Sequence, residues 1–123
     1  MVNKFIGEVD APEFGDGFTI RLDTKGQAEL ETEFGEFDFA HKVNIGLAVI
    51  STKYIQAFLK AALRKDDQRV KELPDIPAPL APIATKCLDA FCLFREGKDA
   101  ETLRAENEAK AADKSNPTRG TKA

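Results

Sequence analysis

The sequence is poor in the residues that carry catalytic and metal chemistry. Its 123 residues include two Cys, one His, one Met, one Tyr and no Trp. No second Cys pair or His cluster completes a zinc site. The P-loop, nucleophile-elbow and zinc-protease motifs are also missing. We therefore expect a protein that is not an enzyme and that uses no metal and no cofactor.

The chain also lacks an excess of basic charge and a long apolar run. Its 18 Lys and Arg are outnumbered by 21 Asp and Glu, which gives a net charge of −3. Nucleic-acid binding needs clustered Lys and Arg that acids do not offset. A membrane span needs about 20 mostly apolar residues in a row, and no basic-then-apolar signal peptide is visible. We expect no nucleic-acid partner, no membrane span and a cytoplasmic location.

Apolar residues are concentrated in the first four fifths of the chain. All nine Phe lie within residues 1–97, whereas residues 98–123 contain one large apolar side chain, Leu103. Such a segment cannot bury enough apolar surface to offset the entropy of ordering it. We predict one domain over 1–97 and a charged, mostly disordered tail over 98–123. Within this tail, the Ala-, Glu- and Lys-rich stretch 99–112 indicates a nascent or fraying helix, followed by disorder over 113–123.

Two extended runs begin the chain. Residues 17–22 place Phe18, Ile20 and Leu22 on one face and polar residues on the other, a period of two that is typical of a half-buried strand. Residues 3–9 form the other run, and the Pro, Gly and Asp between the two runs are typical of turns. We predict an antiparallel hairpin with a longer loop.

Helical patterns follow the hairpin. Thr24 and Gln27 fit a capping box for a helix that ends at Gly35. A short helix over 37–47 comes next. The clearest helix begins at Ser51 or Thr52, and its apolar stripe, from Tyr54 through Leu63, recurs at helical period with basic residues at its end.

A proline-rich connection separates the last helix from the rest. Pro77, Pro79 and Pro82 cannot all lie inside a helix, so we expect an extended segment that leads into a helix over 82–97. Gly97 occupies the position of a C-terminal cap. The resulting fold class is α+β, an N-terminal hairpin followed by three to four packed helices.

The few chemically active side chains have plainer explanations. Cys87 and Cys92 lie about 140° apart on a helix, so we interpret both as free thiols in apolar surroundings. His41 is expected at the surface. The acidic run over 29–38 is splayed around a helix and is expected to face solvent. A small redox enzyme that uses Cys87 or Cys92 stays an alternative.

Two short helices carry many large apolar side chains, and two explanations stay open. All of them form the core, or part of them forms a groove or dimer face for an apolar helix. The second explanation predicts a protein-binding face made of five residues, namely Phe58, Leu59, Leu63, Phe91 and Phe94.

The sequence also resembles one protein family, and the resemblance implies a function for this groove. The stretch FTIRLDTKGQAELETEFGEF, followed by ISTKYIQAFLKAALR, resembles the small tail-assembly chaperones of siphophage-like tails and gene transfer agents. The pattern runs from Arg21, Leu22 and Asp23 through Glu29-Leu30-Glu31 to Gly35. The second helix then carries Leu59, Ala62, Leu63 and Arg64. The resemblance covers roughly residues 3–97.

The resemblance implies a non-enzymatic protein in the cytoplasm of a bacterial host cell. Such a chaperone coats the long, apolar, helical tape-measure protein until the tail tube polymerises around it. Other tail proteins are possible partners, as is a second copy in a homo-oligomer. The alternative is a structural virion component, either a minor tail protein or a head–tail connector, which would persist in the mature particle.

Overall fold

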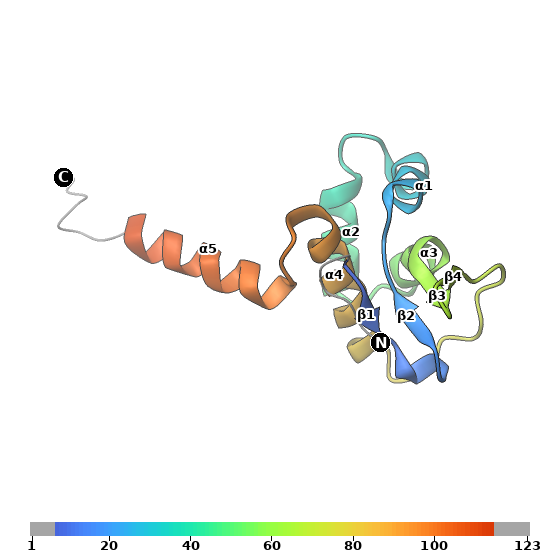
Figure 1. Cartoon of the computed structure of the whole chain (residues 1–123). Coiled ribbons are helices and arrows are strands. Elements are labelled where there is room, and N and C mark those ends of the chain that lie inside the picture. The colour runs from blue at the N-terminus through green and yellow to red at the C-terminus, as the bar shows by residue number, and fades with distance from the viewer. Residues whose placement is uncertain (1–6, 115–123) are drawn as a thin grey trace.

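Four short strands and five α-helices make up the part of the chain that the structure describes (Figure 1). The computed structural model describes the backbone of residues 7–114 and the side chains of residues 7–110. The predicted α+β class is confirmed. In chain order the elements are β1 (Val9–Asp10), the 3-10 turn η2 (Pro12–Phe14), β2 (Phe18–Ile20), α1 (Thr24–Phe34), α2 (Phe39–Ala48), α3 (Thr52–Ala62), β3 (Leu63–Lys65), β4 (Gln68–Arg69), α4 (Leu80–Glu96) and α5 (Ala100–Lys114).

The strands form one antiparallel sheet in the order β1-β2-β3-β4. The predicted N-terminal hairpin is confirmed, because Val9 of β1 pairs with Ile20 of β2. Residues 3–6 of the first predicted run lie outside the described residues. Ile20 also pairs with Leu63 of β3, and both side chains are buried. The sheet is thereby fastened to the end of α3.

The β3–β4 hairpin corrects the prediction that the third helix continues through Leu63 into the basic residues at its end. α3 ends at Ala62, and Leu63 already belongs to a strand. The turn is formed by Asp66 and Asp67, whose φ angles are 51° and 68°. Positive φ at both central residues is the geometry of a type I′ hairpin turn, which Asp tolerates better than most residues. Leu63 also continues the helical stripe, so periodicity alone does not reveal the strand.

α1 begins with a side-chain cap from Asp23. Its Oδ1 accepts a hydrogen bond from the backbone N of Gly26 over 2.8 Å, so Asp23 is the N-cap instead of the predicted Thr24. Gly26, expected only to weaken the helix, permits a close approach to α3. A Cβ at this position would lie 2.7 Å from the carbonyl oxygen of Ala61. The predicted end of the helix at Gly35 is confirmed.

α3 is the central helix of the body and contacts α1, α2 and α4. Its Phe58 ring meets Phe91 of α4 edge to face, with ring centroids 5.9 Å apart. Phe91 also meets Phe39 of α2 at 6.2 Å. All three rings are buried, and each contributes about 2–3 kcal/mol of apolar transfer free energy. This aromatic trio joins the three helices into one core.

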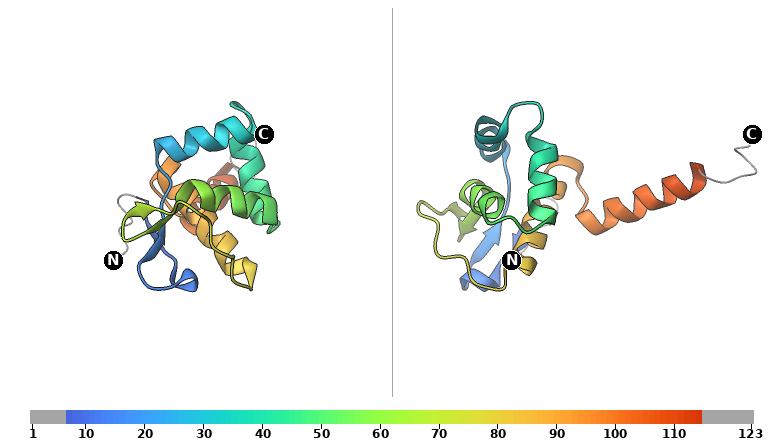
Figure 2. Two further views of the ribbon diagram at one scale, coloured as in Figure 1. Left: turned by 90° about the vertical axis from the view of Figure 1, so that its right-hand side faces the viewer. Right: turned by 180° about the vertical axis from the view of Figure 1, so that it is seen from behind.

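The segment between β4 and α4 is irregular, as predicted from its prolines. α4 begins at Leu80, two residues before Pro82, which therefore lies in the first turn, where its missing N–H breaks no helical hydrogen bond. Gly97 caps the helix in the left-handed conformation, with φ 75°. Beyond it, α5 extends away from the body (Figures 1 and 2).

The charged tail is more regular than its composition predicts. A continuous helix runs from Ala100 to Lys114, where the sequence indicates a nascent helix over 99–112. Residues 115–123, the remainder of the predicted disordered segment, lie outside the described residues. Asp99 caps this helix, because its Oδ1 accepts a hydrogen bond from Thr102 N over 2.9 Å. The cap and the high helical propensity of the sequence explain how the helix forms although it has no large buried face.

Candidate protein-binding surfaces

The binding face expected from the sequence is largely core. Phe58, Leu59, Leu63 and Phe91 are at most 1% exposed, and Phe94 is half-buried against the same cluster. The four buried side chains fill the space between α3, β3 and α4, so they are not presented to a partner in this fold. The expectation of a surface at these positions is corrected, and exposed apolar groups lie elsewhere.

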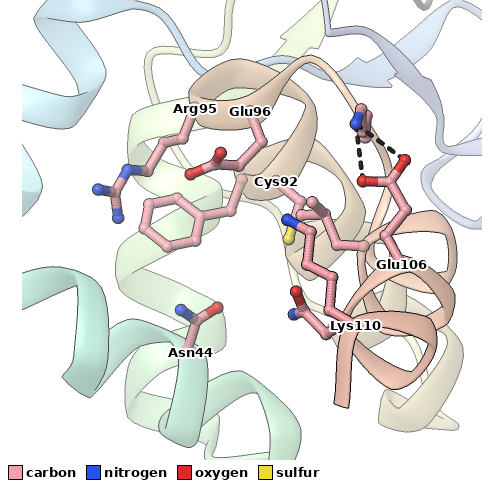
Figure 3. A pocket seen from close by; sticks show the side chains of 10 residues that line it. Asn44, Cys92, Arg95, Glu96, Glu106 and Lys110 are labelled. Carbon is pink, nitrogen blue, oxygen red and sulfur yellow. Dashed lines mark hydrogen bonds and ion pairs between the residues drawn. The ribbon is translucent and has the colours of Figure 1, made fainter. Parts of the chain in front are cut away.

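A cleft opens between α4, α5 and the side of α2 (Figure 3). Its cavity volume is about 410 Å³. We refer to it as the α4–α5 cleft, lined by Asn44, Phe91, Cys92, Arg95, Glu96, Lys98, Leu103, Glu106, Asn107 and Lys110. Phe91, the one core residue of the predicted face that reaches this cleft, contributes to its floor.

Most of the side chains that line the α4–α5 cleft are polar or charged, and its apolar part is made by Cys92, Leu103 and the nearly buried Phe91. Leu103 of α5 is half-buried beside Cys92 of α4, and a second hollow on its other side is lined by Leu88. Arg95 lies over the Phe91 ring, 5.4 Å from its centroid. On the opposite rim, Lys98 donates to Glu106 over 2.7 Å (Figure 3). A small apolar patch between charged borders suits the edge of an amphipathic helix.

Few polar groups fasten α5 to the body. The carboxylate of Asp89 accepts a hydrogen bond from the backbone N of Ala100 over 3.2 Å. Leu103 supplies the apolar contact with α4. The ion pair between Lys98 and Glu106 joins the loop that precedes α5 to α5, and so does not hold α5 against the body. Half-burial of one leucine is worth about 1 kcal/mol. α5 packs on α4, and most of its described side chains are exposed.

Sequence reasoning missed a second apolar surface, on the outside of α2. Four large side chains in and around α2 have exposed fractions from 41% to 91%; one, Ile45, lies on the helix, and the others, Phe37, Val49 and Ile50, lie just before and just after it. We call the four the α2 stripe. The available signal was that residues 37–50 hold more apolar residues than one helix face requires. Because the buried face of α2 is already filled by Phe39, Val43 and Leu47, the surplus faces outward.

Neither thiol is in an environment that favours its reactive form. Burial raises the pKa of the Cys87 thiol far above its ordinary value. Partial burial raises the pKa of Cys92 as well, and the carboxylates of Asp89 and Glu96 raise it further. Since the thiolate is the nucleophile, both surroundings work against redox or nucleophilic chemistry. Both cysteines are free, as interpreted from their spacing.

The remaining candidate residues are at the surface. His41 is exposed on α2, and the acidic run over 29–38 is exposed or half-exposed. Two of its members form ion pairs, Glu29 with Arg69 at 2.6 Å and Asp38 with Lys42 at 3.7 Å. Within residues 7–114, no group of three or more His, Cys, Asp or Glu side chains is arranged to hold a metal ion.

None of the helices in the described part of the chain combines the length and apolar character needed to cross a membrane. Comparisons of the chain with protein-family models, with curated proteins and with solved structures give no match.

Proposed function

We propose that this chain is a non-enzymatic, phage-type tail-assembly chaperone that binds an apolar helical segment of a tape-measure protein in the cytoplasm of a bacterial cell. The observation that carries the proposal is the α4–α5 cleft, in which a small apolar patch is bordered by charged side chains. The order of elements, a hairpin that leads through a short helix into an amphipathic helix, is consistent with the resemblance carried by residues 21–35.

The chemistry of the cleft matches the needs of such a partner. A long amphipathic helix aggregates through its apolar face until a protein surface covers it. Cys92 and Leu103 offer apolar contacts, while Arg95 and Lys110 lie at the rim, where they can meet carboxylates of the partner. Because α5 is held by few contacts, it can move aside for a helix at a small cost in free energy.

The test is a pull-down of the tagged chain from particle-producing cells, with bound proteins identified by mass spectrometry. Enrichment of one very long, helix-rich protein of tape-measure type is expected. The variant Leu103→Asp places a charge on the cleft floor and should abolish this enrichment. Ala105→Asp makes the same change in charge at an exposed position of α5 and should leave it intact.

Circular dichroism of both variants must match the unmodified chain, so that a lost interaction is not a lost fold. Recovery of tube or head–tail proteins at fixed stoichiometry would overturn the chaperone proposal. So would the presence of the chain in purified mature particles, and either result would favour a structural virion component.

A further inference from the structure

The Arg95 side chain is held in place by two aromatic rings at the α4–α5 cleft. Its guanidinium carbon lies 5.4 Å from the centroid of the Phe91 ring and 5.7 Å from that of the Phe39 ring. The two rings meet edge to face with centroids 6.2 Å apart, and both are buried. Because the rings belong to the core, the guanidinium that rests on them is restricted in its motion although the residue itself is exposed.

The N–H groups of this guanidinium have no carboxylate to bind within the described side chains. A guanidinium that lies over a ring uses its face for that contact, so the N–H groups at its edge stay available as donors. Among residues 7–110, Arg95 contacts the two rings and forms no ion pair or hydrogen bond through its side chain. By contrast, Arg64 and Arg69 each pair with a carboxylate of the chain. Arg95 is therefore a placed cation whose donors are open to a ligand.

The charges around the cleft favour an anionic ligand. Its charged lining consists of three cations, Arg95, Lys98 and Lys110, and two carboxylates, Glu96 and Glu106, in a chain whose net charge is −3. Lys98 and Glu106 already pair with each other. Of the other groups, Arg95 comes from α4 and Lys110 from α5, and Glu96 is the one carboxylate that faces them in the lining (Figure 3). Positive charge is thus in excess beside the apolar patch.

The position of Arg95 on α4 sets the spacing that a helical ligand must have. Arg95 follows Cys92 by three residues, so it lies about 4.5 Å further along the helix axis. Cys92 forms the apolar patch together with Leu103. A helix along the cleft that places an apolar side chain on this patch brings the residue three or four positions away, one turn along, to the level of Arg95. A carboxylate at that position can accept hydrogen bonds from the guanidinium.

We propose that the α4–α5 cleft preferentially binds an amphipathic helix that carries an acidic residue one turn from an apolar one, and that Arg95 is the residue that recognises this carboxylate. The inference rests on the proposed function and narrows its partner to acidic segments of a tape-measure protein. Arg95 presents two N–H groups in a planar fork, which matches the two oxygens of a carboxylate. Its placement by the rings reduces the entropy lost when the pair forms. Lys110 adds a second, less directional attraction.

Two synthetic peptides test this preference by fluorescence anisotropy with the purified full chain. Both are amphipathic helices of about 18 residues, built from Ala and Leu and long enough to form a helix. The first, the Glu peptide, has Glu one turn from each Leu, and the second, the Gln peptide, has Gln at the same positions. The Glu peptide should bind about fivefold more tightly at low salt. This advantage should shrink as the salt concentration rises, because ions screen the attraction.

Substitution of Arg95 tests its role. Arg95→Gln should remove most of the preference for the Glu peptide and leave binding of the Gln peptide unchanged. Lys53→Gln is the matched control, because it removes the same charge from a cation that also lies over a ring, 5.9 Å from the Phe34 centroid, but that does not line the cleft. Circular dichroism checks that each variant is folded. Arg95→Lys is the second variant, which keeps the charge over the rings without the planar fork and should keep only part of the preference.

Equal binding of the Glu and Gln peptides would overturn the inference, and so would a preference that survives both substitutions of Arg95. Failure of both peptides to bind would overturn it as well, because the cleft then does not accept an acidic amphipathic helix. The proposed function is judged separately, by the pull-down from cells. A tape-measure protein that the Arg95→Gln chain enriches as strongly as the original chain, and that Leu103→Asp loses, would overturn the role of Arg95 and leave the proposed function standing.

Discussion

Gly46 of α2 lies directly against the Tyr54 side chain of α3. A Cβ at Gly46 would overlap Tyr54 Cγ and lie 2.8 Å from Tyr54 Cβ, so the side chain of α3 occupies the space that a side chain at Gly46 would need. Tyr54 in turn stacks on Phe34 of α1, with ring centroids 4.5 Å apart. The close contact between the backbone of Gly46 and the Tyr54 side chain therefore sets the position of α2. The position of α2 in turn sets that of both candidate surfaces.

Gly46→Ala should destabilise the fold, although alanine normally favours a helix. The added methyl group cannot be accommodated without shifting Tyr54, and overpacking of this kind costs about 1–3 kcal/mol. Urea denaturation followed by circular dichroism measures the loss. Asn44→Ala, on the exposed side of the same helix, is the control and should change stability by less than about 0.5 kcal/mol. A Gly46→Ala chain as stable as the original would contradict the close contact.

Asp23→Ala should cost about 1 kcal/mol at neutral pH, because it removes the cap of α1 and the partner of Arg64, whose Nη2 donates to Asp23 Oδ2 over 2.7 Å. Thr24→Ala, at the adjacent residue that the sequence pattern favours as the cap, should cost much less. Equal losses from the two substitutions would show that the cap is wrongly assigned. Thermal unfolding of the two variants side by side decides this.

The same aspartate predicts a pH dependence. Partial burial raises the pKa of Asp23, but the hydrogen bond from Gly26 and the Arg64 and Arg69 cations outweigh it and hold the pKa below its ordinary value of 3.8. A lowered folded-state pKa means that the stabilisation is present above the unfolded pKa and is lost as the pH falls through the folded one. The stability gap between the original chain and Asp23→Ala should therefore be constant near neutrality and narrow below about pH 4.

Much of the fold can be predicted from the sequence where pattern and local chemistry agree. The hairpin follows from the alternation at Phe18 and Ile20, and the ends of α1 and α4 follow from Gly35 and Gly97. The β3–β4 hairpin is not predicted from the sequence, because Leu63 fits both a helical and a strand pattern. Tertiary pairing with Ile20 decides between them, and no local window contains that pairing.

The candidate surfaces are harder to predict, for a physical reason. Periodicity shows which residues are apolar but not how much surface the neighbouring elements cover. Phe58 and Phe91 appear surplus on their helices, yet they meet each other across the core. Ile45 and Val49 look like ordinary core residues, yet α2 has its buried face filled without them. Burial is settled by packing between elements far apart in the sequence.

At position 50, glycine should be more stable than alanine, which reverses the usual order in and around helices. Both substitutions remove most of the exposed isoleucine side chain, but only Gly relieves the positive φ of 59°, which costs a non-glycine residue about 1–2 kcal/mol. Urea denaturation of Ile50→Gly and Ile50→Ala compares them directly. Ala48→Gly, at the exposed last residue of α2, is the control and should show the ordinary order, in which the chain with glycine is the less stable. An Ile50→Ala chain that is more stable than Ile50→Gly would contradict the strained helix end.

The two cysteines should respond differently to a thiol reagent. Cys87 is fully buried and should be labelled only when the chain unfolds, whereas Cys92 lines the α4–α5 cleft and is half-exposed. Because its pKa is raised by burial and by Asp89 and Glu96, the labelling of Cys92 should be slow at neutral pH and should keep accelerating to a higher pH than that of a free thiol. A Cys92→Ser chain, which should not be labelled while folded, identifies the reacting group. Rapid labelling of both thiols in the native chain would contradict the core.

The same reaction assigns a bound helix to one of the two candidate surfaces. A helical segment in the α4–α5 cleft covers Cys92 and should slow its labelling. The same segment on the α2 stripe should not, because none of the four residues of the stripe lines the cleft. Labelling rates measured with and without a saturating amount of the Glu peptide therefore decide between the two surfaces. Unchanged labelling of Cys92 while the peptide is bound would contradict binding in the cleft.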